Sequence, residues 1–508
     1  MINICIIATI VIYLVGMLLV GFVYSKSNED SSDFYLGGRK MGPLVTAMSA
    51  EASDMSSWLL MGMPGLAYLT GIASPGWTAI GLALGTWLNW LIVARRLRRY
   101  SANLEAITVP QFLSLRFHDQ RNLLNALGAV IIIVFFVPYT ASGFAACGKL
   151  FHSLFGVDYM AAMVVSACVI VGYTITGGFR AVTTTDLIQS IVMSLALVAV
   201  LVYGIGAAGG WDAVVANAQS LPGYLTMMAS HNAAEGTATS YSLLDIVSTM
   251  AWGLGYFGMP HILVRFMAVR DEKEMTKSKA TAISWVALSL GFAVFIGILG
   301  RAYLPELVNG NNEKVFIEMI KKVFTVEMRA PFIAGLFLCG ILAAIMSTAD
   351  SQLLVSASSV AEDIFKGLLK KDADDKTVMN VSRVTVLVVA VLAYIIAWNP
   401  NNTVMGLVSN AWAGLGAAFG PLVVMSLYWK RTNFPGAVAG IVTGALAVII
   451  WDYIPLVGGQ TLGKATGLYS LVVGFGLGLI AIIAVSLTTK TPSEEMLQEF
   501  EDVKANRL

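Results

Sequence analysis

The sequence predicts an all-α polytopic membrane protein with about thirteen transmembrane helices. Hydrophobic residues make up 57% of the 508 positions and charged residues only 12%, about half the charged share of a soluble globular domain. Apolar stretches near the ~20 residues that a helix needs to cross a bilayer recur along the chain. Lys and Arg gather in alternate connecting segments, as they do on the cytoplasmic side of membrane proteins.

The thirteen spans are expected near 3–24, 43–69, 74–94, 122–147, 158–176, 187–207, 243–265, 281–301, 330–358, 383–398, 403–429, 434–454 and 466–488. The first span lacks the basic leader and the cleavage site of a signal peptide, and it is too long for the apolar core of one. We therefore expect this helix to remain in the membrane.

The connecting segments predict the orientation. When alternate segments are assigned to opposite faces, one face receives 25 of the 32 Lys and Arg residues and the other receives seven. Because cytoplasmic loops are rich in these residues, the N-terminus is expected outside and the C-terminus in the cytoplasm. The segment 211–240 has no Lys or Arg and is expected outside.

Residues 302–329 are the main exception, because they carry positive charge on the outer face. Their apolar residues repeat at helical spacing, which predicts an external amphipathic helix against the membrane domain. The repeating residues are Val315, Phe316, Met319, Ile320, Val323 and Phe324.

Two predicted spans contain residues that form poor helices. The first, from Ala47 to Gly65, mixes Gly and Pro with small hydroxyl residues, and the second, 252–260 (WGLGYFGMP), is rich in Gly and ends in Pro. Unwound backbone at membrane depth is tolerated only inside protein or beside a water-filled cavity. A pair of such segments in corresponding positions of two halves indicates the binding site of a transporter.

These segments open spans two to six and seven to eleven. Because five is odd, the second set must cross the membrane upside down, which predicts a five-plus-five inverted-repeat transporter core with broken first helices. The chain is expected to form one transmembrane domain, with an extra helix and loop at 1–41, the core at 42–429, and two helices with a short tail at 430–508. The alternative for the broken segments is close helix packing by small residues.

Ionisable residues inside a span cost about 2.5–3.5 kcal/mol and are usually functional. Asp54 is the deepest, Asp186 lies at the inner end of the sixth span, and Asp350 follows Ser347 and Thr348. Glu51, Asp245 and Asp452 are expected to form structural hydrogen bonds or to lie at solvated helix ends.

A sodium site fits this chemistry, because hard cations prefer oxygen ligands. Ser347 and Thr348 place hydroxyl groups one turn beyond the Ala344 carbonyl, on the same helix face. The alternative is that both hydroxyls bond their own helix.

The chain resembles the sodium/solute symporter family, most closely its sodium/proline symporters. The resemblance runs from 34–39 (FYLGGR) to the last span. It is carried by 53–62 (SDMSSWLLMG), 252–261 (WGLGYFGMPH), 341–348 (ILAAIMST) and 406–421 (GLVSNAWAGLGAAFGP).

The resemblance implies sodium-coupled uptake of L-proline across a bacterial plasma membrane, with the lipid bilayer as surroundings. It implies a sodium site made by the carbonyls of Ala52, Met55 and Ala344 and the hydroxyls of Ser347 and Thr348. Asp54 would lie near the ion. Asp186 would lie on the inner ion path or at a second ion site, and Arg39 would take part in coupling.

The resemblance also implies the substrate site, at Ser56, Ser57, Trp58, Tyr139, Trp252, Tyr256 and Pro260. Aromatic rings can enclose a pyrrolidine and attract its ammonium group, and the N-terminus of a half-helix can hold a carboxylate. The alternative for Trp252 and Tyr256 is an aromatic belt at the membrane interface.

The sequence departs from the family pattern at three places. Ser57 stands where glycine is common, Glu51 stands where a small residue is common, and Asp350 with Ser351 replaces an uncharged pair. Another amino acid, pantothenate, a sugar or an acidic sugar therefore remains an alternative substrate, although a charged solute would call for Lys or Arg in the pocket.

Other classes of protein fit less well. A channel should show a repeated filter motif, a sensor should carry a soluble signalling domain, and an enzyme should show a nucleophile with a base. The four histidines are not at metal-ligand spacing. We expect no enzyme activity, no cofactor besides the coupling sodium ion, no nucleic-acid partner and no obligatory protein partner.

Overall fold

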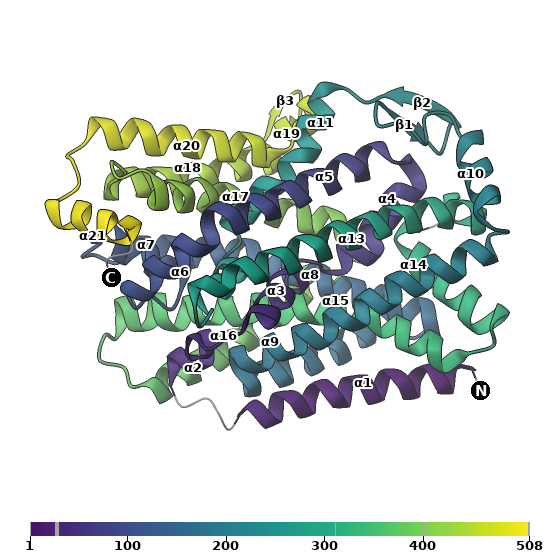
Figure 1. The fold of residues 1–508 in the computed structure, drawn as a ribbon, viewed down its shortest axis with the longest axis horizontal. Coiled ribbons are helices and arrows are strands. Elements are labelled where there is room, and N and C mark those ends of the chain that lie inside the picture. Colours follow the sequence, from purple (N-terminus) through teal and green to yellow (C-terminus); the bar gives the residue numbers. More distant parts are fainter. Residues whose placement is uncertain (1, 26–29, 310, 400–401, 506–508) are drawn as a thin grey trace.

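The computed structural model describes residues 2–25, 30–309, 311–399 and 402–505, and most of this chain is helical. The long helices lie side by side and run between two ends of the molecule (Figure 1). Ten helices in these ranges are long and apolar enough to cross a membrane. The all-α polytopic fold class is therefore confirmed.

The first half of the chain contains α1 (Ile2–Ser25), α2 (Ser31–Leu36), α3 (Pro43–Ala52), α4 (Met63–Thr70), α5 (Ala73–Leu88), α6 (Ala94–Asn103), α7 (Val109–Arg116), α8 (Leu123–Phe155), α9 (Tyr159–Ala207), α10 (Trp211–Ser220) and α11 (Leu243–Met250). The second half contains α12 (Pro260–Met267), α13 (Met275–Tyr303), α14 (Val315–Ile320), α15 (Pro331–Ser358), α16 (Asp375–Ala397), α17 (Val404–Tyr428), α18 (Phe434–Tyr453), α19 (Leu462–Thr466), α20 (Ser470–Thr488) and α21 (Glu494–Ala505).

Two small antiparallel hairpins complete the described fold. They are β1–β2 (Ala229–Asn232 and Thr237–Ser240) and β3–β4 (Pro455–Val457 and Gln460–Thr461). The first hairpin and α10 fill the segment 211–240 and lie at the end of the molecule opposite α21 (Figure 1).

The long helix α9 reverses at Gly178, which has φ 61° and ψ −162°, a conformation that glycine adopts without steric cost. Just before α9, Ser153 donates to Glu318 of α14. Just after the reversal, Arg180 pairs with Asp33 of α2 at the other end of the molecule. The chain then returns to α14, where a Cβ on Gly204 would lie 2.9 Å from Met319. The two antiparallel arms cover the predicted spans 158–176 and 187–207.

Both predicted helix breaks are present. Between α3 and the π-helical turn η2 (Trp58–Gly62) the backbone is not helical, and between α11 and α12 the chain forms the 3₁₀ segment η4 (Ala251–Gly258) and then turns at Met259. Met41, before α3, exchanges backbone hydrogen bonds with Ala268 and Arg270, after α12. One broken segment therefore begins where the other ends, and the two run in opposite directions.

Close backbone contact holds the second break in place. A Cβ on Gly85 of α5 would lie 2.3 Å from the carbonyl oxygen of Gly253 in η4, and a Cβ on Gly255 would lie 2.0 Å from the Trp412 indole of α17. Larger residues would separate these elements, because a Cβ needs more than 3 Å from its neighbours. The glycines of the second segment thus permit η4 to pack between α5 and α17.

The helix expected within 302–329 is confirmed. It consists of α14 and the π-helical turn η8 (Lys321–Glu327), and its six repeating apolar residues are buried. They pack against α4, α13 and α15, which is why a segment with several charges still folds onto the bundle.

Three of the cations assigned to loops by charge are buried, Arg116 among them, and the other two pair with carboxylates. Arg265 is only 1% exposed and pairs with Asp186, while Lys149 is buried and pairs with Glu313 at 2.7 Å. The charge count treated all three as exposed, because it used only position along the chain. Arg265 and Lys149 each have a carboxylate partner, as charges inside a membrane bundle usually do.

Candidate functional site

The break after α3 exposes backbone carbonyl groups inside the protein. Helical bonding ends where Met55 donates to the Glu51 carbonyl, and Ser56 N–H then folds back onto the Asp54 carbonyl at 2.8 Å. The Asp54 carbonyl also accepts the Trp58 indole N–H at 3.0 Å and faces the Tyr139 hydroxyl at 3.5 Å. The side chains of Trp58 and Tyr139 thus hold the unwound backbone.

Asp54 connects the two broken segments. The Tyr256 hydroxyl of η4 donates to Asp54 Oδ2 at 2.5 Å, and Asp54 Oδ1 has no hydrogen-bond partner among the described residues. Both side chains are fully buried. A carboxylate in this position places negative potential at the meeting point of the two breaks, where it can stabilise a nearby cation without the cost of a direct ion pair.

Oxygen atoms of α15 and of Ala52, at the end of α3, lie close together beside the first break. The Ser347 hydroxyl donates to the Ala52 carbonyl at 2.8 Å and lies 3.3 Å from the Ala344 carbonyl. The Thr348 hydroxyl lies 3.2 Å from the same Ala344 carbonyl. Thr348 therefore bonds its own helix, whereas Ser347 bridges α15 and α3.

Four of the five predicted sodium ligands thus lie together, at Ala52, Ala344, Ser347 and Thr348. Met55 lies in the same break and is fully buried. Hydroxyl groups have lone pairs as well as a proton, so a rotation of Ser347 and Thr348 would turn oxygen acceptors toward a cation.

Aromatic side chains surround the Asp54–Tyr256 contact. The rings of Trp58 and Trp252 lie 6.4 Å apart, and Tyr256 packs edge-on against Trp412 at 5.2 Å. Trp412 was not predicted from the sequence, and its indole N–H donates to the Trp252 carbonyl at 2.8 Å. It therefore fixes the unwound segment from the α17 side.

The remaining predicted substrate residues also lie in the two breaks. Ser56 Oγ lies 3.4 Å from Trp58 N–H, and Ser57 Oγ is buried without a hydrogen-bond partner among the described residues. Pro260 is the first residue of α12 and is buried. Direct contacts or shared contacts with Asp54 connect Ser56, Trp58, Tyr139, Trp252 and Tyr256, while Ser57 and Pro260 lie in the same two broken segments.

A second polar cluster, which we call the inner cluster, lies toward the end of the protein where α2 and α6 are found. It consists of Ser49, Asp186, Arg265, Asp350 and Ser351. Arg265 donates to Asp186 Oδ2 at 2.9 Å, to Ser351 Oγ at 2.5 Å and to Ser49 Oγ at 2.7 Å.

Asp350 completes the inner cluster and has no ion pair among the residues that the structure describes. Its Oδ2 accepts from the Tyr173 hydroxyl at 2.7 Å, and its Oδ1 accepts from Ser351 at 3.1 Å. Sequence reasoning did not single out Arg265. The available signal was a basic residue at the end of a predicted span, in a chain with several intramembrane carboxylates that need partners.

Arg39 lies outside the two clusters and ties several elements together. Its guanidinium donates to the carbonyls of Met267, Ser101 and Ala106 at 2.6–3.0 Å. Burial lowers the pKa of Arg39 to about 10, so the side chain stays charged at neutral pH. It joins the end of the broken segment η4–α12 to α6 and the loop before α7.

Glu51 has a structural partner, as expected. Trp90 of η3 (Asn89–Val93) donates its indole N–H to Glu51 Oε1 at 2.7 Å. Asp245 caps α11 in a reciprocal bond with Ser242, and Asp452 accepts from Ser470 at 2.7 Å.

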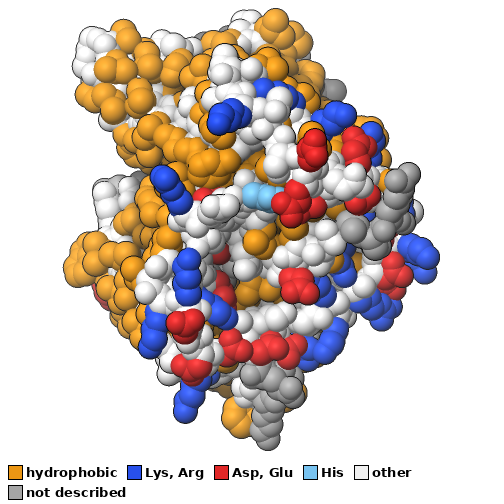
Figure 2. All heavy atoms as spheres, turned by 90° about the vertical axis from the view of Figure 1, so that its left-hand side faces the viewer, with side chains coloured by type: hydrophobic (Ala, Val, Ile, Leu, Met, Phe, Trp, Pro, Cys, Tyr) orange, Lys and Arg blue, Asp and Glu red, His pale blue; other side chains and the backbone are white. Residues whose placement is uncertain are grey.

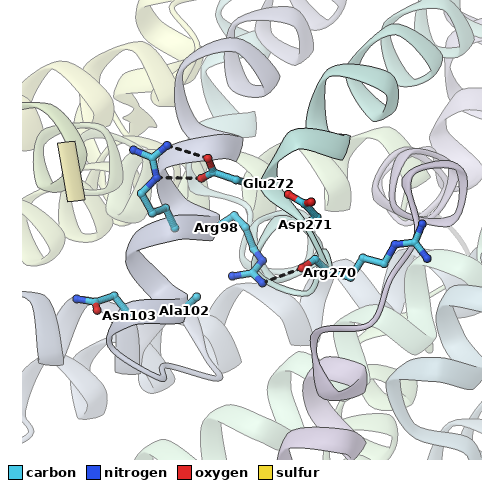
Figure 3. Close-up of a pocket in the computed structure, with 7 residues that line it drawn as sticks. Arg98, Ala102, Asn103, Arg270, Asp271 and Glu272 are labelled. Atoms are coloured by element: carbon cyan, nitrogen blue, oxygen red, sulfur yellow. Dashed lines mark hydrogen bonds and ion pairs between the residues drawn. The ribbon is translucent and has the colours of Figure 1, made fainter. Parts of the chain in front are cut away.

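A cavity of about 510 Å³ opens beside the end of α6, between Arg98, Arg99 and the residues from Arg270 to Glu272. Figure 3 shows both bonds of an arginine to Glu272 and the contact of Arg98 with the Arg270 backbone. Arg99 and Glu272 neutralise one another here and connect α6 with the segment between α12 and α13. The residues that line this cavity are not among those of the two broken segments.

Comparisons with known proteins agree with this geometry. The profile of the sodium:solute symporter family matches residues 34–444. The high-affinity proline transporter PutP of Bacillus subtilis is 42% identical and covers 96% of this chain and 98% of its own. The sodium/proline symporter of Escherichia coli is 43% identical and covers 98% of this chain and 96% of its own.

A solved structure shares the fold. A sodium-coupled sialic acid symporter, in a substrate-bound outward-open state, covers 97% of this chain and 99% of its own with a TM-score of 0.77 and 21% sequence identity. The arrangement of α1 to α20 is therefore one that occurs in a secondary transporter.

Proposed function

The chain belongs to the sodium:solute symporter family, and from that premise we propose that it imports L-proline together with sodium by alternating access. The observation that carries the proposal is the convergence of the Ala52 and Ala344 carbonyls with the Ser347 hydroxyl, beside the buried Asp54. The protein is then a transporter of the bacterial plasma membrane and not an enzyme.

In the proposed mechanism, sodium binds between the first break and α15. The carbonyls of Ala52, Met55 and Ala344 and the hydroxyls of Ser347 and Thr348 would hold the ion, and Asp54 would raise its affinity. Because Tyr256 bonds Asp54, an ion at this site would also fix η4 relative to α3. Proline would bind among Trp58, Tyr139, Trp252 and Tyr256, with Ser56, Ser57 and Pro260 at the two breaks.

The energy for uptake comes from sodium entry. One sodium ion moving inward gains about 2.3 kcal/mol per 100 mV of membrane potential. This energy supports a roughly fifty-fold accumulation of a coupled solute, because about 1.4 kcal/mol changes an equilibrium tenfold.

We also propose thirteen membrane crossings, with the N-terminus outside, an inverted-repeat core over 42–429, and the C-terminus in the cytoplasm. The opposite directions of the two broken segments and the reversal of α9 support this count. Lys, Arg, Asp and Glu side chains gather at the end where α6, α7 and α21 lie (Figure 2), which supports a cytoplasmic position for that end. Lys26 and Arg507, two charges of the predicted inner face, lie outside the described residues.

The proposed inner path is at the inner cluster, where Asp186 and Arg265 meet, and Arg39 would couple α12 to α6. Neither role requires a cofactor besides sodium or an obligatory protein partner.

Initial uptake of radiolabelled L-proline into proteoliposomes tests the proposed function. An inward sodium gradient should accelerate uptake over a potassium gradient, and excess unlabelled L-proline should compete more strongly than pantothenate, a sugar or other amino acids. Sodium-dependent uptake of another solute, without proline uptake, would retain the ion site and reject the substrate. Equal proline uptake under a sodium gradient and under a potassium gradient would reject the coupling.

A further inference from the structure

A separate cavity of about 310 Å³ lies beside Trp252, between the end of α11 and the residues that precede α20. This volume is at the small end of the range for ligand pockets, roughly 300–1,000 Å³. The lining residues come from the end of α11, from η4, α17 and α18, and from the segment that leads from α19 into α20. They are Ser248, Thr249, Trp252, Ser409, Asn410, Asp452, Gly463, Gly467, Leu468, Tyr469 and Ser470.

Asp452 makes the cavity anionic, since it is the one charged side chain among the described residues that line it. Ser470 donates to its Oδ2 at 2.7 Å. A Cβ on Gly463 would lie 3.1 Å from its Oδ1, so the glycine keeps this oxygen accessible. The cavity therefore presents a carboxylate oxygen that a cationic group can approach.

Aromatic faces provide a second attraction for a cation. Tyr469 and Trp252, which both line the cavity, stack at 5.4 Å with an interplanar angle of 18°. The Tyr469 hydroxyl donates to the Ser409 carbonyl at 2.7 Å, which fixes its ring. Electron-rich aromatic faces attract ammonium groups and also cover apolar rings.

Trp252 connects the cavity with the candidate substrate site, because its ring also lies 6.4 Å from that of Trp58. A solute in the cavity would be separated from the Asp54–Tyr256 region by this indole. The cavity therefore lies on a direct approach to the substrate residues.

We propose that this cavity is an outer loading site for the zwitterionic amino acid. Its ammonium group binds Asp452, its apolar ring lies against Trp252 and Tyr469, and the Asn410 amide and Thr249 hydroxyl are donors available to its carboxylate. The inference rests on the proposed function, since it assumes an amino-acid substrate that enters from this side.

The test compares Asp452→Asn with Glu235→Gln, which removes a charge from the exposed β1–β2 hairpin on the same side. Initial proline uptake is measured in intact cells, with membrane amounts of each protein determined. Asp452→Asn should raise the KM for proline about tenfold and change the maximal rate less than about twofold, because it removes capture and not translocation. Asp452→Glu should restore the KM.

Equal KM values for Asp452→Asn and Glu235→Gln would overturn the loading site. If Asp452→Asn does not reach the membrane, Gly463→Ala replaces it, because its methyl group would press on Asp452 Oδ1 while the charge remains. An increased KM with a retained maximal rate supports the proposal, and an unchanged KM rejects it. If the protein without substitutions shows no sodium-dependent proline uptake, the proposed function is rejected instead.

Discussion

The Ser347 hydroxyl determines whether α15 and the first helix break share a ligand. Its bond to the Ala52 carbonyl crosses between two elements, whereas the bond of Thr348 stays within α15. A serine that only satisfied its own helix would not need this second partner. Local back-bonding therefore does not account for Ser347, whose hydroxyl connects α15 with α3.

Ser347→Ala and Thr348→Ala should each raise the sodium concentration for half-maximal uptake by about tenfold or more, since each removes one of the proposed oxygen ligands of sodium. Ser358→Ala is the matched control, because that hydroxyl bonds the Val355 carbonyl of the same helix at 2.9 Å. Sodium titration of proline uptake measures the effect. Equal sodium dependence in all three variants would place the ion elsewhere.

Tyr256→Phe tests the link between the two broken segments. The variant keeps the ring against Trp412 but removes the donor to Asp54. A hydrogen bond to a charged group contributes about 1.5–3 kcal/mol, so the half-maximal concentrations of both sodium and proline should rise. Tyr68→Phe, which loses a bond to the Leu304 carbonyl, is the control. An effect on proline alone would show that the link does not transmit sodium binding.

At the scale of elements, the inner cluster joins the end of α12 to α3, α9 and α15 through Arg265. The sequence identified Asp186 and Asp350 because carboxylates inside apolar spans are conspicuous. It did not identify Arg265, because a basic residue at the end of a span is equally consistent with a cytoplasmic loop. Only the three-dimensional approach of α12 to α9 distinguishes these positions.

Arg265→Met should destabilise the protein by about 3–5 kcal/mol, because it leaves the Asp186 charge buried without its partner. The double variant Arg265→Met with Asp186→Asn should recover part of this loss. Thermal unfolding of the purified protein in detergent measures both, with Arg95→Met as a control for an exposed arginine that pairs with Glu272. Additive losses in the double variant would contradict a direct ionic pair.

The broken elements were predictable from glycine, proline and small hydroxyl residues, and both are present. Their partners were less predictable. Trp412 and Tyr469 contact Trp252 from α17 and from the start of α20, more than 150 residues away in the chain. Contacts between such distant residues produce no pattern in the local sequence. The sequence of an apolar helix therefore does not show whether its aromatic residue faces lipid or the substrate site.

At the scale of the whole molecule, the termini lie at opposite ends of the bundle, with α1 along one edge and α18 and α20 along the other (Figure 1). Hydropathy separated the two arms of α9 as the spans 158–176 and 187–207, but it did not predict that one residue, Gly178, reverses the chain between them. Composition nevertheless predicted the membrane class, and the helical spacing of apolar residues predicted the helix of residues 315–324.

Single cysteines test the proposed orientation. In a background without the four native cysteines, Glu235→Cys in the β1–β2 hairpin should react with an impermeant maleimide on intact cells. Glu501→Cys in α21 should react only after the membrane is opened, because its end carries the proposed cytoplasmic charge (Figure 2). Labelling of both positions from outside would refute the opposite placement of the two ends.

In the proposed mechanism, sodium movement drives proline movement through one site. Proteoliposomes are loaded with labelled L-proline at the same concentration inside and outside, and an inward sodium gradient is then imposed. Coupled transport predicts net accumulation of proline inside, reversal when the sodium gradient is reversed, and no net movement with Ser347→Ala/Thr348→Ala at the same sodium concentration. Equal proline concentrations on both sides under the sodium gradient, in vesicles that exchange proline rapidly, would contradict coupled transport.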